Sequence, residues 1–181
     1  MRRICTIVLL FASVSVYAAD ATEKFETKSN QANPVLLEVI SSLADPATFR
    51  KTGEDLDKIF SKHCSKKDVI KEKSGIDIRY DCDEIKSGIK SVHFDSREWA
   101  GKPNYLMYLT IDFGYPQYAE IKSLLTKKLG SAQRKKDKDY TGWIFRKDKF
   151  LNEIGTPVID VSRDKQYNVG TFNVALEQGD N

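Results

Sequence analysis

The residues of this chain that could do chemistry are few and widely spaced. Its only histidines, His63 and His93, stand thirty positions apart, and the chain has no Cys-x-x-Cys or His-x-x-x-His spacing. Metal sites need clustered ligands. A Gly-x-Ser-x-Gly elbow, a Gly-rich phosphate loop and a zinc-protease helix are also absent from the sequence. We therefore expect neither a metal nor another cofactor.

Carboxylates are plentiful, but their spacing singles out no catalytic pair. Two carboxylates held roughly 5 to 9 Å apart can hydrolyse a glycosidic bond. Asp77, Asp81, Asp83 and Glu84 are instead interpreted as solvent-facing strand or turn residues, because they alternate with apolar positions or border them. The chain is not expected to be an enzyme, although a hydrolase with a dispersed carboxylate site stays open as an alternative.

The cysteine pair Cys64 and Cys82 is expected to form a disulfide. An even pair in an exported chain meets an oxidising compartment. The bridge would close a loop of 19 residues, counted from 64 to 82 inclusive, which is worth about 3 kcal/mol by chain entropy. The alternative is a nucleophilic dyad of His63 and Cys64, but neighbours on a helix point about 100° apart and do not face each other.

Aromatic residues in polar segments are the candidates for partner binding. Trp99 lies beside Arg97 in a polar connection between two expected strands, and exposed Trp and Arg are typical of interface hot spots. The alternative is that Trp99 folds back over the sheet edge. Tyr115, Tyr118 and Tyr140 flank an expected helix and would also suit a contact surface.

The first half of the chain reads as helices followed by strands. Asn33 and Pro34 look like a helix N-cap and first position, followed by an apolar stripe to Leu43, and a capping box of Thr52 with Asp55 begins a second helix that should run to about Cys64. Period-two alternation then predicts strands over 76–82, 89–95 and 105–113. Cys82 is expected to point toward the helix that carries Cys64.

The second half reads as a repeat of this pattern. A helix from Pro116 to Leu129 matches the helix before Cys64 at an offset of 65, and the strand positions match at an offset of 67. We therefore expect an α+β fold made by tandem duplication of one helix packed on a three-stranded antiparallel sheet, with an extra N-terminal helix. This plan is similar to that of beta-lactamase inhibitor proteins in architecture, although no motif is shared.

The first eighteen residues have the pattern of a secretory signal peptide. Arg2 and Arg3 precede an apolar run over 4–16, and Val16-Tyr17-Ala18 offers a cleavage site. Thirteen apolar residues fall short of the roughly 20 that span a bilayer, so no membrane insertion is expected after cleavage. The expected organisation is a signal peptide (1–18), a flexible lead-in (19–33), a first unit stapled by the disulfide (34–113) and a second unit (114–181).

The charge balance argues against a nucleic-acid partner. Without Arg2 and Arg3 the chain has 27 basic and 26 acidic residues, a net charge of +1 instead of the +3 of the full sequence. Such a chain has no global field that would attract a polyanion. The basic stretch at 134–139 is interleaved with acids and is interpreted as a solvated loop.

These observations favour an exported module that binds another protein. The short signal, the Lys-rich composition and the lack of an Asn-x-Ser/Thr site favour a bacterial source and a periplasmic or secreted location. We expect an immunity or inhibitor protein that blocks an envelope-acting toxin or hydrolase by stoichiometric binding. A cell-envelope assembly or structural factor is the alternative of a different class.

Overall fold

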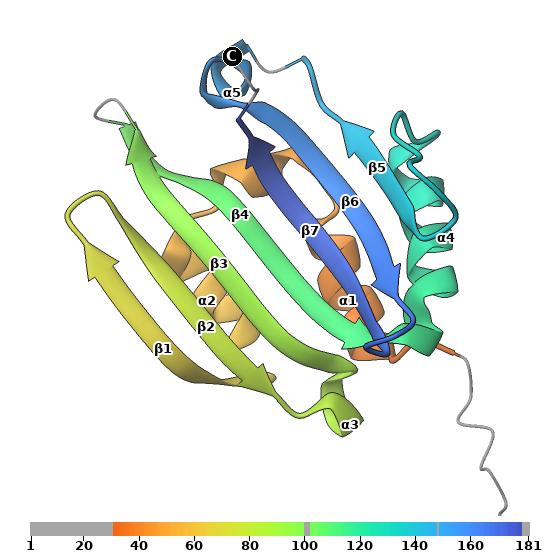
Figure 1. Cartoon of the computed structure of the whole chain (residues 1–181). Coiled ribbons are helices and arrows are strands. Elements are labelled where there is room, and N and C mark those ends of the chain that lie inside the picture. Colours follow the sequence, from red (N-terminus) through yellow and green to blue (C-terminus); the bar gives the residue numbers. More distant parts are fainter. Residues whose placement is uncertain (1–30, 100–101, 148, 179–181) are drawn as a thin grey trace, which may run out of the picture.

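The computed structural model describes residues 31–99, 102–147 and 149–178, so the expected signal peptide and most of the lead-in lie outside the described residues. Within these ranges three helical segments come first, and strands, mostly in consecutive pairs, follow with helical segments between them (Figure 1). The helical elements are α1 (Pro34–Leu43), η1 (Pro46–Arg50), α2 (Gly53–Phe60), α3 (Glu84–Ser87), η2 (Tyr115–Gln117), α4 (Tyr118–Leu129) and α5 (Lys149–Ile154). The strands are β1 (Cys64–Glu72), β2 (Gly75–Cys82), β3 (Ile89–Trp99), β4 (Lys102–Gly114), β5 (Tyr140–Ile144), β6 (Thr156–Asp164) and β7 (Val169–Glu177).

All seven strands form one antiparallel sheet in the order β1-β2-β3-β4-β7-β6-β5. The helices α1 and α2 lie behind the sheet, and α4 lies behind its β5 side (Figure 1). Because side chains alternate between the two faces of a strand, one face packs on these helices, and none of the described helices covers the other. We call this second surface the open face.

The predicted helix starts are confirmed by their caps. The Asn33 side chain accepts a hydrogen bond from the backbone of Val35, with Pro34 at the first helical position. Thr52 and Asp55 form the complete capping box at the start of α2. Each cap satisfies amide groups that the first helical turn leaves without partners.

The core fills the space between the helices and the sheet. Its largest fully buried side chains include Phe49, Phe60, Phe94, Phe172 and Trp143, which come from both halves of the chain. Burial alternates regularly along β7, with Phe172 and Val174 buried and their neighbours half-buried. One core therefore underlies the whole sheet.

The expected tandem duplication of a helix on a three-stranded sheet is wrong. The predicted strands are present, but β4 pairs with β7 over Tyr108 to Gly114, so strands of both halves belong to a single seven-stranded sheet. Two separate sheets would leave long unpaired edges, and this pairing satisfies their backbone groups. The expected similarity to beta-lactamase inhibitor proteins rested on the tandem plan, and it is lost together with that plan.

The position of Cys64 also differs from the prediction. The second helix ends at Phe60, and Cys64 begins β1, which sequence periodicity did not reveal. From Ser65 to Glu72 every residue of β1 is exposed, because the strand lies at the edge of the sheet. β1 carries no period-two signal, because its two large apolar residues, Val69 and Ile70, are adjacent and lie on opposite faces of the strand.

Candidate functional site

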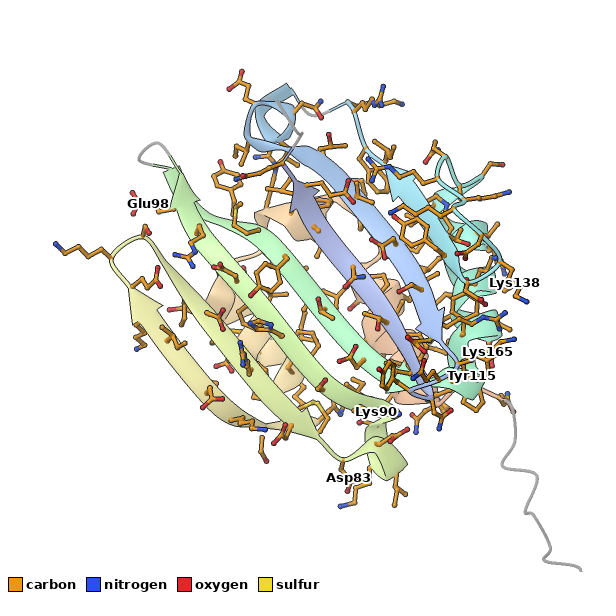
Figure 2. The ribbon with its side chains drawn as sticks, in the orientation of Figure 1. Asp83, Lys90, Glu98, Tyr115, Lys138 and Lys165 are labelled. Atoms are coloured by element: carbon orange, nitrogen blue, oxygen red, sulfur yellow. A yellow bond between two sulfur atoms is a disulfide. The ribbon has the colours of Figure 1, made fainter. Side chains whose placement is uncertain are left out.

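The open face is the candidate functional site, because its polar side chains stand in rows across neighbouring strands. The register places Arg79, His93, Thr110, Asn173 and Asp160 in one row that crosses β2, β3, β4, β7 and β6. Figure 2 shows polar side chains spread over this face of the ribbon. A second row contains Asp81, Ser91, Asp112, Thr171 and Ser162.

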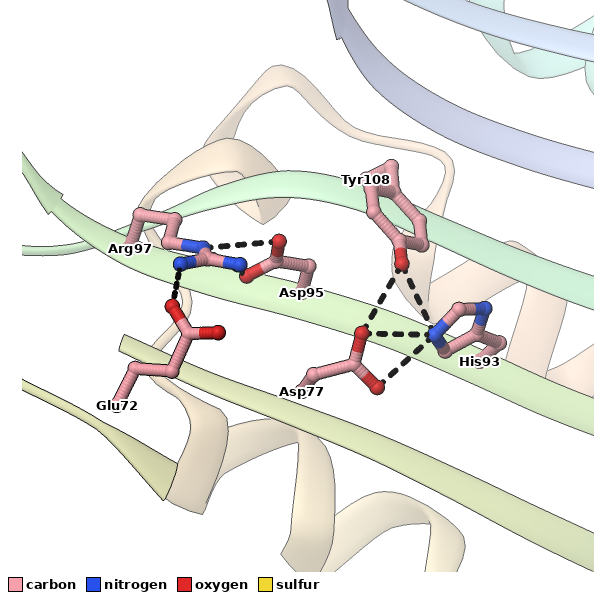
Figure 3. A network of polar contacts seen from close by, with 6 residues as sticks. All are labelled: Glu72, Asp77, His93, Asp95, Arg97 and Tyr108. Atoms are coloured by element: carbon pink, nitrogen blue, oxygen red, sulfur yellow. Dashed lines mark hydrogen bonds and ion pairs between the residues drawn. The ribbon is translucent and has the colours of Figure 1, made fainter. Parts of the chain in front are cut away.

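A cluster of Asp77, His93 and Tyr108 occupies the β2–β4 part of the open face (Figure 3). The Nε2 atom of His93 lies 3.0 Å from both carboxylate oxygens of Asp77 and 2.9 Å from the hydroxyl oxygen of Tyr108. The Tyr108 hydroxyl also donates to Asp77 Oδ2 at 3.2 Å. Burial and the Asp77 carboxylate raise the pKa of Tyr108 to about 12, so the phenol stays protonated. The cluster can hold a proton between three groups.

Arg97, a predicted hot-spot residue, is tied down by two carboxylates. Its Nε donates to Asp95 at 2.7 and 2.9 Å, and its Nη1 is paired with Glu72 (Figure 3). Side-chain hydrogen bonds to these two carboxylates raise the pKa of Arg97. The guanidinium is about one-third exposed, so it presents a fixed charge at this end of the open face.

Asp160 is a buried carboxylate in the first row. It is 7% exposed, and its Oδ1 accepts a hydrogen bond of 2.9 Å from Asn173, whose own Oδ1 accepts from Thr110 at 3.0 Å. Burial raises the pKa of Asp160 to about 6. Ionising this group is therefore unfavourable in the free protein, and a cation beside it would offset that cost.

Asp112 is held in the second row by hydroxyl groups of the strands on either side. Ser91 donates to its Oδ2 at 2.8 Å, and Thr171 donates to its Oδ1 at 3.0 Å. The carboxylate is half-buried and fixed in direction, which preorganises it for a ligand that approaches from above the sheet.

The open face is acidic although the chain as a whole is nearly neutral. Carboxylates outnumber cations on this face, even with His93 counted as a cation. By strand register the carboxylates are Asp68, Glu72, Asp77, Asp81, Asp95, Asp112, Asp160 and Glu177. The cations are Arg79 and Arg97, together with Lys67 paired with Asp81, Arg134 paired with Glu177, and Lys136 over the ring of Tyr140. A shallow hollow of about 270 Å³ beside His93 includes Arg79 and Asp81 in its lining. Such a surface favours a basic partner.

The other residues expected to bind a partner lie apart from this cluster. Trp99 ends β3, where its backbone pairs with Lys102, and its side chain lies outside the described part of the chain. Tyr118 is buried, and the Arg163 guanidinium stacks on the rings of Tyr115 and Tyr118 at 5.2 and 4.6 Å from their centroids. These tyrosines support the β6 end of the sheet.

Tyr140 lies at the opposite edge of the sheet from β1. It is half-buried, its ring lies under Lys136 at 5.2 Å, and burial raises the pKa of its hydroxyl. Arg134, from the basic stretch, makes a β-bridge with Gly142 and an ion pair with Glu177. Part of that stretch is therefore attached to the sheet and does not form a free basic patch.

The disulfide between Cys64 and Cys82 is present. The two residues face each other directly in the β1–β2 register, with their Cα atoms 4.2 Å apart. The bridge joins two strands instead of a helix and a strand. It fixes one end of β1 to the sheet.

Sequence reasoning missed His93, Tyr108, Asp112, Asp160 and Asn173 as site residues. Each occupies a polar position of a strand whose alternate positions are apolar, and this alternation was the available signal. It gives the face on which a residue lies, but it does not give the neighbour across the sheet. Asp77 contacts His93 diagonally, because the direct partner of His93 in β2 is Arg79.

Comparisons with known proteins identify no relative: no family model, no curated protein and no solved structure matches the chain. Within the described ranges, no helix is long and apolar enough to cross a membrane. The same ranges contain no group of three or more His, Cys, Asp or Glu side chains placed to hold a metal ion.

Proposed function

We propose that this chain is an exported protein-binding module that docks its open face on a basic surface of another protein. The observation that carries the proposal is a broad sheet face without a helical cover, on which carboxylates stand in register and are fixed by neighbouring side chains. A rigid, charged surface loses little side-chain entropy on binding and selects for complementary charge.

Within this class, an immunity or inhibitor role is the specific function we propose. A toxin or hydrolase that acts on anionic polymers presents a basic cleft, and an acidic face can occupy such a cleft stoichiometrically. The buried Asp160 supports this role, because a lysine or arginine of the partner would stabilise its ionised form. The disulfide suits an oxidising compartment.

The first step of the test is to capture partners from periplasmic extract. The bait is the chain from Ala19 with its disulfide formed. The affinity of a captured protein is then measured for the double variant Asp77→Asn with Asp112→Asn, which keeps the side-chain size and one acceptor oxygen on each residue and removes two charges. We expect binding at least about tenfold weaker, or about 1.4 kcal/mol. Glu38→Gln on the exposed surface of α1 is the matched control and should leave affinity unchanged.

Equal affinity for the double variant and for the parent protein would reject the open face as the docking surface. Trp99→Ala remains a separate prediction of strong weakening, and unchanged affinity there would remove only Trp99 from the site. A partner belonging to the envelope-assembly machinery, together with an envelope defect on deletion in the absence of any toxin, would favour the assembly factor over the inhibitor.

A hydrolase is kept as a second candidate because of Asp160. A buried carboxyl group with a pKa of about 6 can act as a general acid near neutral pH. Turnover of a glycan or peptide substrate that is lost in Asp160→Asn, with the fold retained, would establish this function in place of simple binding.

A further inference from the structure

The outer edge of the sheet at β1 is a second surface that could join another protein. β1 is nine residues long and pairs on one side with β2, while its other side meets no further strand of the described sheet. Figure 1 shows it at the margin of the molecule, away from α4 and α5. A bulge at Lys67 interrupts β1, and the regular part of the edge runs from Asp68 to Glu72. This part offers a row of backbone donors and acceptors for an added strand.

Apolar side chains are exposed at this edge. Val69 is 43% exposed and Ile70 is 53% exposed, on opposite faces of β1. Beneath the edge, a groove of about 720 Å³ lies between α2 and the strands β1 and β2, with Val69, Ile76 and Ile78 among its lining residues. An added strand could place an apolar side chain over this groove.

Of the three lysines along β1, one makes no ion pair with a described residue and can therefore bind a charged partner. Lys66 pairs with Asp57 of α2, and Lys67 pairs with Asp81 of β2. Lys71 lines the groove beside Val69 and makes no ion pair with any described residue. Glu54 of α2 lines the opposite side of this groove. On the side of β1 that faces the groove, Lys71 is the charged side chain left without an ion pair among the described residues, which favours an acidic residue directly opposite it on an added strand.

A second copy of this chain fits the edge poorly. Two β1 strands related by a two-fold axis would pair antiparallel around a central residue. Centring on Ile70 sets Asp68 opposite Glu72, and centring on Asp68 sets two aspartates opposite each other. Like charges directly opposite are destabilising. Centring on Val69 sets Asp68 opposite Ile70 and runs into the bulge at Lys67, which shortens the regular pairing. These registers therefore oppose self-pairing.

We propose that the β1 edge binds an extended segment of another protein by strand addition, and that this segment has apolar residues flanked by acidic residues. Its apolar side chains contact Val69 and Ile70, and an acidic side chain meets Lys71 at the groove. The disulfide at Cys64 holds one end of β1 in place, so the template is ordered before the segment arrives. The interaction does not depend on the open face or on its proposed partner.

The probe is a blocked nine-residue peptide with a Val-Ile-Val centre and glutamates on both sides, added to the disulfide-bonded chain from Ala19. We expect saturable binding by calorimetry and slower hydrogen exchange of β1 amides by NMR. Two control peptides are used, one with lysines in place of the glutamates and one methylated at alternate backbone nitrogens. Both should bind at least about tenfold more weakly, because they lose charge complementarity or backbone pairing.

Two variants locate the site. Lys71→Glu and Val69→Asp should each weaken peptide binding about tenfold, while Lys127→Glu on α4 and Ile85→Asp on α3, both exposed, should change it less than about twofold. The proposal is overturned by absent binding, by equal binding of the methylated peptide, or by affinity that neither β1 variant alters. Concentration-dependent dimers that protect β1 would assign the edge to a second copy instead.

Discussion

Asp160 is the residue of the open face on which burial has a large electrostatic effect. It lies in β6 opposite Asn173, and the strand register leaves it surrounded by protein although no helix covers it. Its carboxyl group titrates near pH 6 instead of near 3.8 because of burial. Groups whose pKa is displaced in this way gather at functional sites, where a ligand compensates for the unfavourable charge.

Asp160→Asn is expected to stabilise the protein at neutral pH. Because the pKa of Asp160 is higher in the folded than in the unfolded protein, its contribution is fully present below about pH 4 and is lost as the pH rises through about 6. Above pH 6 the loss amounts to about 1–3 kcal/mol. Urea unfolding at about pH 4 and pH 8 should show a gain for Asp160→Asn only at the higher pH.

The difference between the two proteins is the quantity to compare, because other carboxylates titrate in the opposite sense. Hydrogen bonds to Thr52 lower the pKa of Asp55, and a hydrogen bond to Arg163 lowers that of Asp139. These groups add stability as the pH rises through their own range, equally in both proteins. An Asp160→Asn variant that follows the parent protein at every pH would contradict the assignment of Asp160.

At the scale of elements, the disulfide stabilises β1 by cross-linking it to β2. The strand is exposed along nearly its whole length and has few apolar contacts of its own. Cys64 and Cys82 cross-link it to β2 at the end opposite the turn, so both ends of the hairpin are closed. Without the cross-link the outer part of the hairpin has little to hold it in place.

Cys64→Ser with Cys82→Ser is expected to lower the free energy of unfolding by about 3 kcal/mol, because the bridge closes a 19-residue loop (64 to 82 inclusive). Amides of β1 should exchange faster than those of β3 and β4. Chemical denaturation and native-state hydrogen exchange measure the two effects. Reducing the parent protein serves as the control and should reproduce both, while an unchanged unfolding midpoint would reject this role.

Elements with local signals were predictable, and their assembly was not. The caps of α1 and α2 and the alternation in β2, β3 and β4 depend on residues that are close in sequence, and each was predicted. β1 gave no signal because an edge strand needs no apolar face. The pairing of β4 with β7 depends on contacts such as that between Phe113 and Gly170, where a Cβ atom would lie 2.1 Å from the phenyl ring.

The same limit applied to the candidate site. Polar positions on the strands could be recognised one by one, but the contact of His93 with Asp77 requires the β2–β3 register, and the link from Thr110 to Asn173 requires β4 to lie beside β7. Arg97 was predicted from its place beside Trp99 in a polar connection. It lies within β3, and its carboxylate partners come from other positions of the sheet. Such contacts depend on the order and register of the strands, which the sequence of a single strand does not reveal.

At the scale of the whole molecule, the sequence average conceals an uneven distribution of charge. The full chain has a net charge of only +3, yet the open face collects carboxylates from six strands. On the helical side the two signs balance, because Lys122, Lys127 and Lys128 of α4 are matched by Glu54, Asp55 and Asp57 of α2. An oriented distribution of this kind steers a basic partner to one face and weakens with added salt.

Export is the remaining proposal for the whole chain, and it would connect the expected signal peptide with the disulfide. If residues 1–18 direct export in bacteria, the full chain expressed there should appear in the periplasm with Ala19 as its first residue and with Cys64 bonded to Cys82. Leu9→Arg places a charge in the apolar run and should retain the protein in the cytoplasm with both thiols reduced.

Intact mass and thiol alkylation of the two cell fractions measure cleavage and oxidation together. Lys24→Glu, which lies beyond the expected cleavage point, is the matched control and should be exported normally. A Leu9→Arg chain that is still cleaved and oxidised would show that the apolar run is not the export signal. A retained chain that nevertheless forms its disulfide would separate oxidation from export, and the compartment could then no longer be inferred from the cysteine pair.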